Sequence, residues 1–140
     1  MRPIRVLWSH DPGAQTRGYW AIGVALHRAG CEVVLGGGQT PAEVREAATQ
    51  EQVDVVGFRA LGDGAAQRVR DVQSALATLA RPGAPAPPLA AAGIFEEGEA
   101  ESLRAAGVRE VFDVLTPIEQ IAARLCALGA DAAAARDSTR

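Results

Sequence analysis

The sequence contains no lysine, and all 14 of its basic residues are arginines. Mechanisms that use a lysine Schiff base, a lysine in a phosphate-binding loop or a catalytic ammonium are therefore excluded. No apolar run approaches the roughly 18 residues that a membrane-spanning helix needs, and no signal-peptide pattern opens the chain. We therefore expect a cytoplasmic protein without a membrane partner.

Cysteines are almost as scarce. Cys31 and Cys126 are the only two, and they lie far apart in apolar surroundings. We expect two buried free thiols rather than a disulfide or a zinc site. The net charge of −3 argues against a nucleic-acid partner. With 140 residues, 48% of them hydrophobic, the chain has the size and composition of one globular domain.

Short apolar segments alternate with segments of helical period along the chain. The expected strands are 4–8, 31–35, 53–58, 89–92 and 108–112, and the expected helices are 18–29, one beginning after Thr40, 65–79, 96–106 and one from 116 to 125. Thr40 and Thr116 are each followed by proline and then, three residues after the threonine, by glutamate, which is typical of a helix N-terminus.

Such alternation predicts parallel strands joined by right-handed crossovers. We expect an α/β fold with a doubly wound, five-stranded parallel sheet, flavodoxin-like or Rossmann-like, of order 2-1-3-4-5, with helices on both faces. Residues 1–128 would form the domain, and residues 129–140 a flexible C-terminal tail without core anchors.

Ligands of such sheets bind at the carboxyl ends of the strands, near the point where the strand order reverses. The loop after the first strand is flanked by Trp8, Tyr19 and Trp20, half of the six aromatic residues. These rings form a platform for a planar ligand, or Trp8 and Trp20 simply belong to the core, and we favour the core. His10 and Asp11 form either an acid–base or metal-binding pair or a solvated turn.

Two protein classes with this strand order can be compared with the chain. A response-regulator receiver needs acidic residues after the first strand, a phosphoacceptor aspartate after the third and a lysine after the fifth. This chain has Arg59 after its third strand and no lysine. A flavodoxin needs a hydroxyl-rich phosphate loop after the first strand, which Thr16 alone does not supply. Neither class is therefore expected.

Several motifs resemble a third family. They are Gln39-Thr40-Pro41-Ala42-Glu43, Val53-Asp54-Val55-Val56-Gly57, Ala105-Ala106-Gly107-Val108 and Thr116-Pro117-Ile118-Glu119. With these motifs, the chain resembles the cobalamin (B12)-binding domain of adenosylcobalamin-dependent acyl-CoA mutases such as methylmalonyl-CoA mutase, over roughly residues 4–126. The resemblance implies a subunit of an isomerase that is not catalytic alone, because a separate chain carries the substrate chemistry.

The cobalt-ligand motif of that family, D-x-H-x-x-G after the first strand, is degenerate here. The match places Gly13 at the aspartate and Gln15 at the histidine that ligates cobalt, and retains only Gly18. Because a carboxamide is a poor ligand for cobalt(III), no metal is expected at Gln15, and His10 is the alternative ligand.

The slot for the nucleotide tail of the cofactor also departs from the family pattern. Arg59-Ala60-Leu61 replaces S-x-L after the third strand, and Ala92-Gly93 replaces Gly-Gly after the fourth. The bulkier side chains predict a filled or closed slot. The resemblance assigns cofactor binding to His10, Asp11, Gly13, Gln15, Thr16, Arg17, Gly18, Arg59, Ala60, Leu61, Ala92, Gly93 and Thr116.

Three functions follow as hypotheses. The leading one is a free-standing homologue of the B12 domain with a decayed site. It would act as an accessory or regulatory subunit of a mutase-like catalytic chain or as a homodimer, or bind a small molecule or anion in the cleft. Arg17 and Arg59 would clamp such an anion, unless Arg59 pairs with Asp11 or Asp63. The second is a functional cobalamin-binding subunit with base-on or non-standard ligation. The third is a pure interaction module with a filled cleft.

Overall fold

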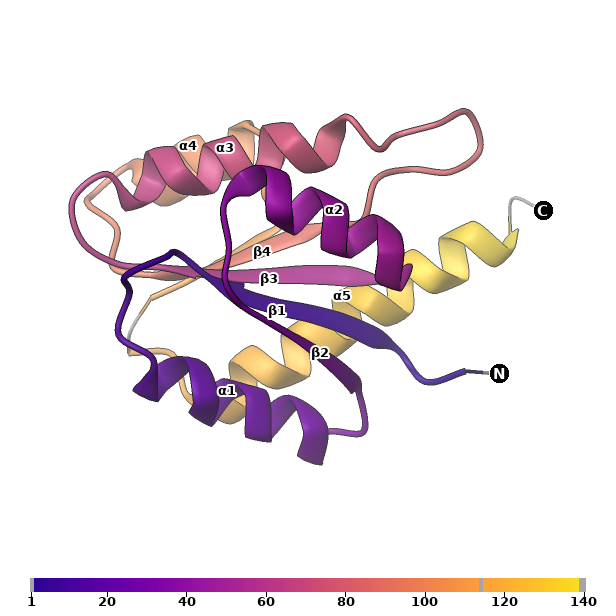
Figure 1. Cartoon of the computed structure of the whole chain (residues 1–140), viewed down its shortest axis with the longest axis horizontal. Coiled ribbons are helices and arrows are strands. Elements are labelled where there is room, and N and C mark those ends of the chain that lie inside the picture. Colours follow the sequence, from indigo (N-terminus) through magenta and orange to yellow (C-terminus); the bar gives the residue numbers. More distant parts are fainter. Residues whose placement is uncertain (1, 114, 139–140) are drawn as a thin grey trace.

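The computed structural model describes residues 2–113 and 115–138, in which strands and helices alternate throughout (Figure 1). The elements are, in chain order, β1 (Arg5–His10), α1 (Arg17–Arg28), β2 (Glu32–Gly38), α2 (Pro41–Glu51), β3 (Val55–Ala60), α3 (Ala65–Ala77), β4 (Leu89–Gly93), α4 (Glu99–Ala105), β5 (Glu110–Phe112) and α5 (Ile118–Ser138). The chain therefore has the strand–helix repeat that the sequence predicts.

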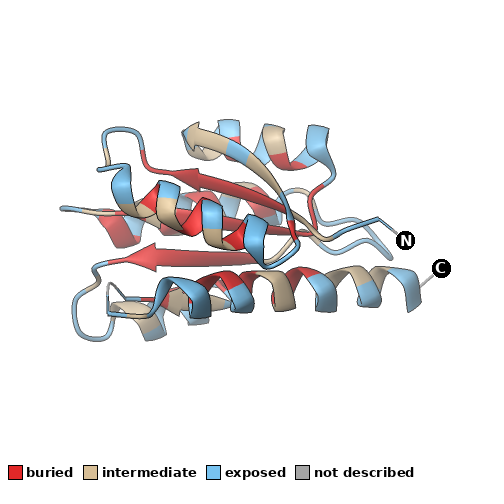
Figure 2. Cartoon of the chain, turned by 90° about the horizontal axis from the view of Figure 1, so that it is seen from below, coloured by how far each residue is buried: buried red, intermediate tan, exposed pale blue. Residues whose placement is uncertain are grey.

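The five strands form one parallel sheet of order β2-β1-β3-β4-β5, which confirms the predicted fold class. Helices α1 and α5 cover one face, and α2, α3 and α4 cover the other (Figure 1). Neighbouring residues of β1 contribute to different cores, because side chains alternate across a strand. Leu7 packs with α2 and α3, whereas Val6 and Trp8 pack with α1 and α5. Figure 2 shows the central strands as almost continuously buried.

The first two strands are longer than predicted at their carboxyl ends. The ladder between β1 and β2 continues after a bulge, with Ser9 opposite Gly37 and His10 opposite Gly38. The predicted second strand ends at Leu35, whereas the three glycines that follow it extend the edge strand to Gly38. This extension brings His10 to the same edge of the sheet as the functional candidates on β3 and β4.

The last helix is also longer than predicted, since α5 continues to Ser138. Asp54, almost completely buried, accepts hydrogen bonds from the Arg5 backbone amide at 2.8 Å and from Arg2 at 3.0 and 3.1 Å, and it pairs with Arg136 near the end of α5. This carboxylate anchors both ends of the described chain. The division of the chain at residue 128 stays a prediction.

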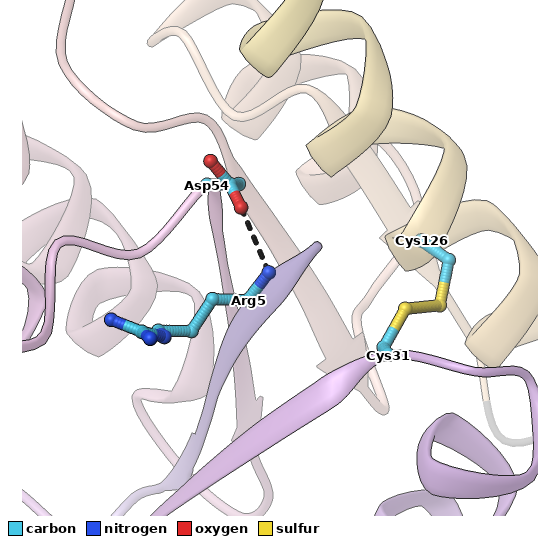
Figure 3. The surroundings of a disulfide bond; sticks show 4 residues. All are labelled: Arg5, Cys31, Asp54 and Cys126. Atoms are coloured by element: carbon cyan, nitrogen blue, oxygen red, sulfur yellow. Dashed lines mark hydrogen bonds between the residues drawn. A yellow bond between two sulfur atoms is a disulfide. The ribbon is translucent and has the colours of Figure 1, made fainter. Parts of the chain in front are cut away.

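The two cysteines form a disulfide, so the prediction of free thiols was wrong. Cys31 lies just before β2 and Cys126 lies on α5 (Figure 3). Their Cα atoms are 6.4 Å apart although 95 positions separate them in sequence. The packing of α1 beside α5 on one face of the sheet brings them together, which no local pattern shows. In the described part of the chain, none of the helices has the length and apolarity needed to span a membrane.

Candidate functional site

The carboxyl edge of the sheet gathers most of the residues singled out from the sequence. His10 on β1 lies between Gly38 on β2 and Arg59 on β3, and Arg59 lies beside Ala92 on β4. Parallel strands end at a common edge, and this explains why distant segments meet here. Two loops lie at the same edge of the sheet. The loop after β1 contains Asp11, Gly13, Gln15 and Thr16, and the loop after β5 contains Thr116.

Arg59 is the central cation of this edge. Its Nη1 donates a hydrogen bond to the carbonyl oxygen of Gln15, and its guanidinium packs against Gly18 at the start of α1. A Cβ atom on Gly18 would lie 2.8 Å from Nη2 of Arg59, so the absence of a side chain at Gly18 makes room for the guanidinium. Burial lowers the pKa of Arg59 from its usual value.

Asp11 pairs with Arg68 of α3 rather than with Arg59. Arg68 also donates hydrogen bonds to the backbone carbonyls of Leu61, at 2.8 Å, and Asp63, at 2.6 Å. It therefore ties the loop after β1 to the loop after β3. The alternative in which Arg59 pairs with Asp11 or Asp63 is therefore wrong. Sequence reasoning missed Arg68, whose one signal is its place in the first turn of the helix that follows the third strand.

Arg17 and Arg59, the two residues of the predicted anion clamp, have different surroundings in the structure, and the clamp stays a prediction. Arg17 is exposed on the first turn of α1, where it has no ion pair or side-chain hydrogen bond among the described residues, while Arg59 is turned toward Gln15. The two guanidinium groups therefore do not share a partner.

His10 is mostly buried and belongs to a network around Tyr19. Its Nδ1 lies 2.8 Å from the carbonyl oxygen of Asp11, and its ring meets that of Tyr19 edge-on, with the centroids 4.6 Å apart. The Tyr19 hydroxyl donates to the Trp8 carbonyl at 2.9 Å and accepts from the Gly37 amide at 3.0 Å. Burial raises the pKa of Tyr19, although the hydrogen bond from Gly37 acts in the opposite direction.

The aromatic residues are divided between core and surface. Trp8 and Tyr19 are buried and stacked, with their centroids 5.6 Å apart, and the Trp8 indole donates to the Tyr19 carbonyl at 2.7 Å. The core interpretation is correct for Trp8. It is wrong for Trp20, which is 54% exposed on the outer side of α1.

Pockets of different sizes lie along this edge of the sheet. The pocket beside Arg59 has a volume of only about 160 Å³ and is lined by Gly18, Ile22, Arg59, Ala92, Gly93, Asp113, Thr116, Ile118 and Ile121. Typical pockets for small molecules begin near 300 Å³. Two further pockets reach that size, one of about 300 Å³ beside Asp11, Leu61 and Arg68 and one of about 340 Å³ beside Gly62, Ile94 and Glu96. Ala60 is buried, and its carbonyl lies so close to Gly93 that no Cβ atom would fit there. No group of three metal-ligating side chains occurs among residues 2–113 and 115–138.

The strand order and the flanking helices define a flavodoxin-like domain. Similar solved structures show which class of such domains the fold resembles. The chain is similar to the signal receiver domain of the response regulator NarL from Mycobacterium tuberculosis, with a TM-score of 0.67 and 16% identity, covering 93% of this chain and 98% of that one. It is also similar to the signal receiver domain of a Luxo repressor protein from Vibrio parahaemolyticus, with a TM-score of 0.71 and 12% identity, covering 96% and 95%.

A response regulator protein from Burkholderia multivorans gives a TM-score of 0.59 at 16% identity, covering 91% of this chain and 95% of that one. No protein-family model and no curated protein matches the chain. The likeness, at identities of 12–16%, establishes the shared fold. The receiver class, rejected above because of its chemistry, is thus the class whose fold this chain shares.

The receiver likeness overturns the resemblance to cobalamin-binding domains. The assignment as a B12 subunit, whether decayed or functional with base-on ligation, is corrected, as is the mutase-like catalytic chain as partner. The matching motifs misled because they serve the common architecture. For example, Thr40 and Glu43 form a capping box at the start of α2. The cofactor role of the thirteen positions rested on that resemblance and stays an untested prediction.

Proposed function

We propose that the chain is a receiver-type signalling domain that acts by protein–protein contact and is not phosphorylated. The proposal is supported by the likeness of its fold to signal receiver domains. The observation that carries it is the position of Arg59 near the carboxyl end of β3, where a receiver needs its phosphoacceptor aspartate.

The chemistry of phosphoryl transfer is missing at this edge. A guanidinium cannot act as the carboxylate nucleophile, and its positive charge opposes a divalent cation at the same place. Of the neighbouring carboxylates, Asp11 pairs with Arg68 and Asp113 accepts from the Leu115 amide at 2.8 Å. The chain also has no lysine to stabilise a phosphoryl group.

The same likeness supports the partner class. Receiver domains usually work with histidine kinases or effector domains, so the partner proposed for this chain is another protein domain. Because Arg59 holds the loop after β1 through Gln15, the domain would present one constant surface instead of switching between two states. The cytoplasmic location expected from the sequence is part of this proposal.

Treatment with acetyl phosphate and Mg²⁺, followed by intact-mass measurement, tests the proposal. We expect the mass of the chain to stay unchanged under conditions that add one phosphoryl group to a receiver domain carrying the aspartate, which serves as the control. A mass increase that corresponds to a phosphoryl group on any aspartate of this chain would contradict the proposal.

A further inference from the structure

Helices α1 and α5 form an open apolar groove on the outside of the molecule, which begins at the carboxyl edge with Ile118 and runs along α1 to Arg28 and Ala29. The groove has a volume of about 560 Å³ and is lined by Ala21, Val24, Ala25, Arg28, Ala29, Ile118, Glu119 and Ala122. The two helices lie beside each other on one face of the sheet (Figures 1 and 2). No other described helix or strand lines the groove.

The groove has large exposed apolar side chains at its rim and alanines at its base. Val24 is 49% exposed and Ile118 is 36% exposed, and Trp20, one turn before Val24 on α1, is also exposed. Large aromatic side chains at a surface are typical of protein interfaces. Alanines on the floor, such as Ala25 and Ala122, let the backbone of another helix approach closely.

The groove is lined by one basic and one acidic side chain, Arg28 and Glu119, which lie at its opposite ends. Glu119 lies in the first turn of α5, and Arg28 is the last residue of α1. Each helix follows a strand of the parallel sheet on the same face, so α1 and α5 run in the same direction. Within the described chain, neither Arg28 nor Glu119 forms an ion pair or a side-chain hydrogen bond.

We propose that this groove binds an amphipathic helix of a partner protein, lying antiparallel to α1 and α5. In that orientation, the first turn of the partner helix meets Arg28 and its last turn meets Glu119. Helices favour acidic residues in the first turn and basic residues in the last, so the charges of the groove match such a helix end for end. The inference rests on the proposed function and names the surface and partner that would carry it out.

Two synthetic peptides test this orientation. The first has 18 residues, with glutamates in its first turn, leucines at a spacing of three and four, and arginines in its last turn. The second has the same composition, with the glutamates and arginines exchanged. Binding is followed by the fluorescence of Trp20, which is exposed whereas Trp8 is buried, and by the amide resonances of the ¹⁵N-labelled chain. We expect the first peptide to bind about tenfold more tightly, with shifts concentrated in α1 and α5.

Substitutions in the groove sharpen the test. The double variant Arg28→Glu with Glu119→Arg is expected to prefer the second peptide, because the charges are exchanged without loss of apolar surface. Val24→Asp should weaken binding of both peptides. Ile94→Asp is the matched control, because Ile94 is exposed on the loop after β4 and lies outside the groove, and it should leave both affinities unchanged.

Several outcomes would overturn the proposal: equal affinity for the two peptides, no reversal in the double variant, or resonance shifts outside α1 and α5. Self-association of the chain through the same residues, with exclusion of the peptide, would make a second copy the occupant and would also overturn it. Intact mass after treatment with acetyl phosphate, measured on the same sample, separates the proposed function from the proposed docking surface. Phosphorylation contradicts the proposed function, whereas failed peptide binding without phosphorylation contradicts the docking surface alone.

Discussion

Arg59 and Gly18 show how one pair of residues fills the space between the end of β3 and the start of α1. The guanidinium occupies the space above the first turn of α1 that the missing side chain of Gly18 leaves open. The sequence shows that Arg59 stands where a receiver needs its phosphoacceptor aspartate, but it does not show the hydrogen-bond partner of Arg59. The backbone carbonyl of Gln15 accepts from it, and a backbone partner leaves no trace in the identity of a residue.

Tyr19 offers a direct test at the residue scale because it is the only tyrosine in the chain. Burial raises its pKa, since the charged phenolate is disfavoured away from water. We expect phenolate absorbance to appear above the ordinary midpoint of about pH 10 in the folded protein, and near it in concentrated urea.

This shift also has a consequence for stability. The folded state binds the Tyr19 proton more tightly than the unfolded state does. Its contribution is therefore complete below about pH 10 and is lost as the pH rises through the raised pKa. Tyr19→Phe should remove that part of the alkaline loss. A folded-state midpoint at or below the urea value would contradict the described burial.

At the scale of helices and strands, Asp54 connects three elements: the start of β1, the start of β3 and the last turns of α5. Asp54→Ala would leave the Arg5 amide and two guanidinium groups without their buried acceptor. We expect unfolding in urea to show a loss of about 3 kcal/mol in the free energy of unfolding. The end of α5 should then exchange its amide hydrogens faster.

An exposed carboxylate provides the control for that change. Asp63 has an exposed side chain, and Asp63→Ala should change the free energy of unfolding by less than about 0.5 kcal/mol. If both variants lost the same stability, the anchoring role of Asp54 would be wrong.

Local patterns predicted the elements well because their causes are local. The capping box of Thr40 and Glu43 is present as predicted, with the Thr40 amide 2.9 Å from Glu43 and the Glu43 amide 3.3 Å from Thr40. By contrast, the extension of β2 through Gly38 pairs with β1, and the end of α5 is tied to Asp54 through Arg136. Such contacts join distant segments, so helix and strand patterns do not reveal them.

At the scale of the whole molecule, the sheet order was predictable and the family was not. Strand–helix alternation leads to a parallel sheet of order 2-1-3-4-5, and the structure has it. The same alternation is shared by protein classes with different chemistry, so helix caps and buried strands cannot distinguish among them. Arg59 and Arg68 do distinguish them, because Arg59 lies where a receiver needs its phosphoacceptor aspartate and Arg68 pairs with Asp11 at the same edge.

The central claim is that the carboxyl edge does not respond to a phosphoryl group, and amide resonances of the ¹⁵N-labelled chain test it most directly. The spectrum is compared with and without beryllofluoride, a mimic of the phosphoryl group, and Mg²⁺. We predict superimposable spectra, including the resonances of His10, Arg59, Ala92 and Gly93 at that edge. Saturable shifts centred on these residues would show that the edge binds a phosphoryl group and would contradict the account.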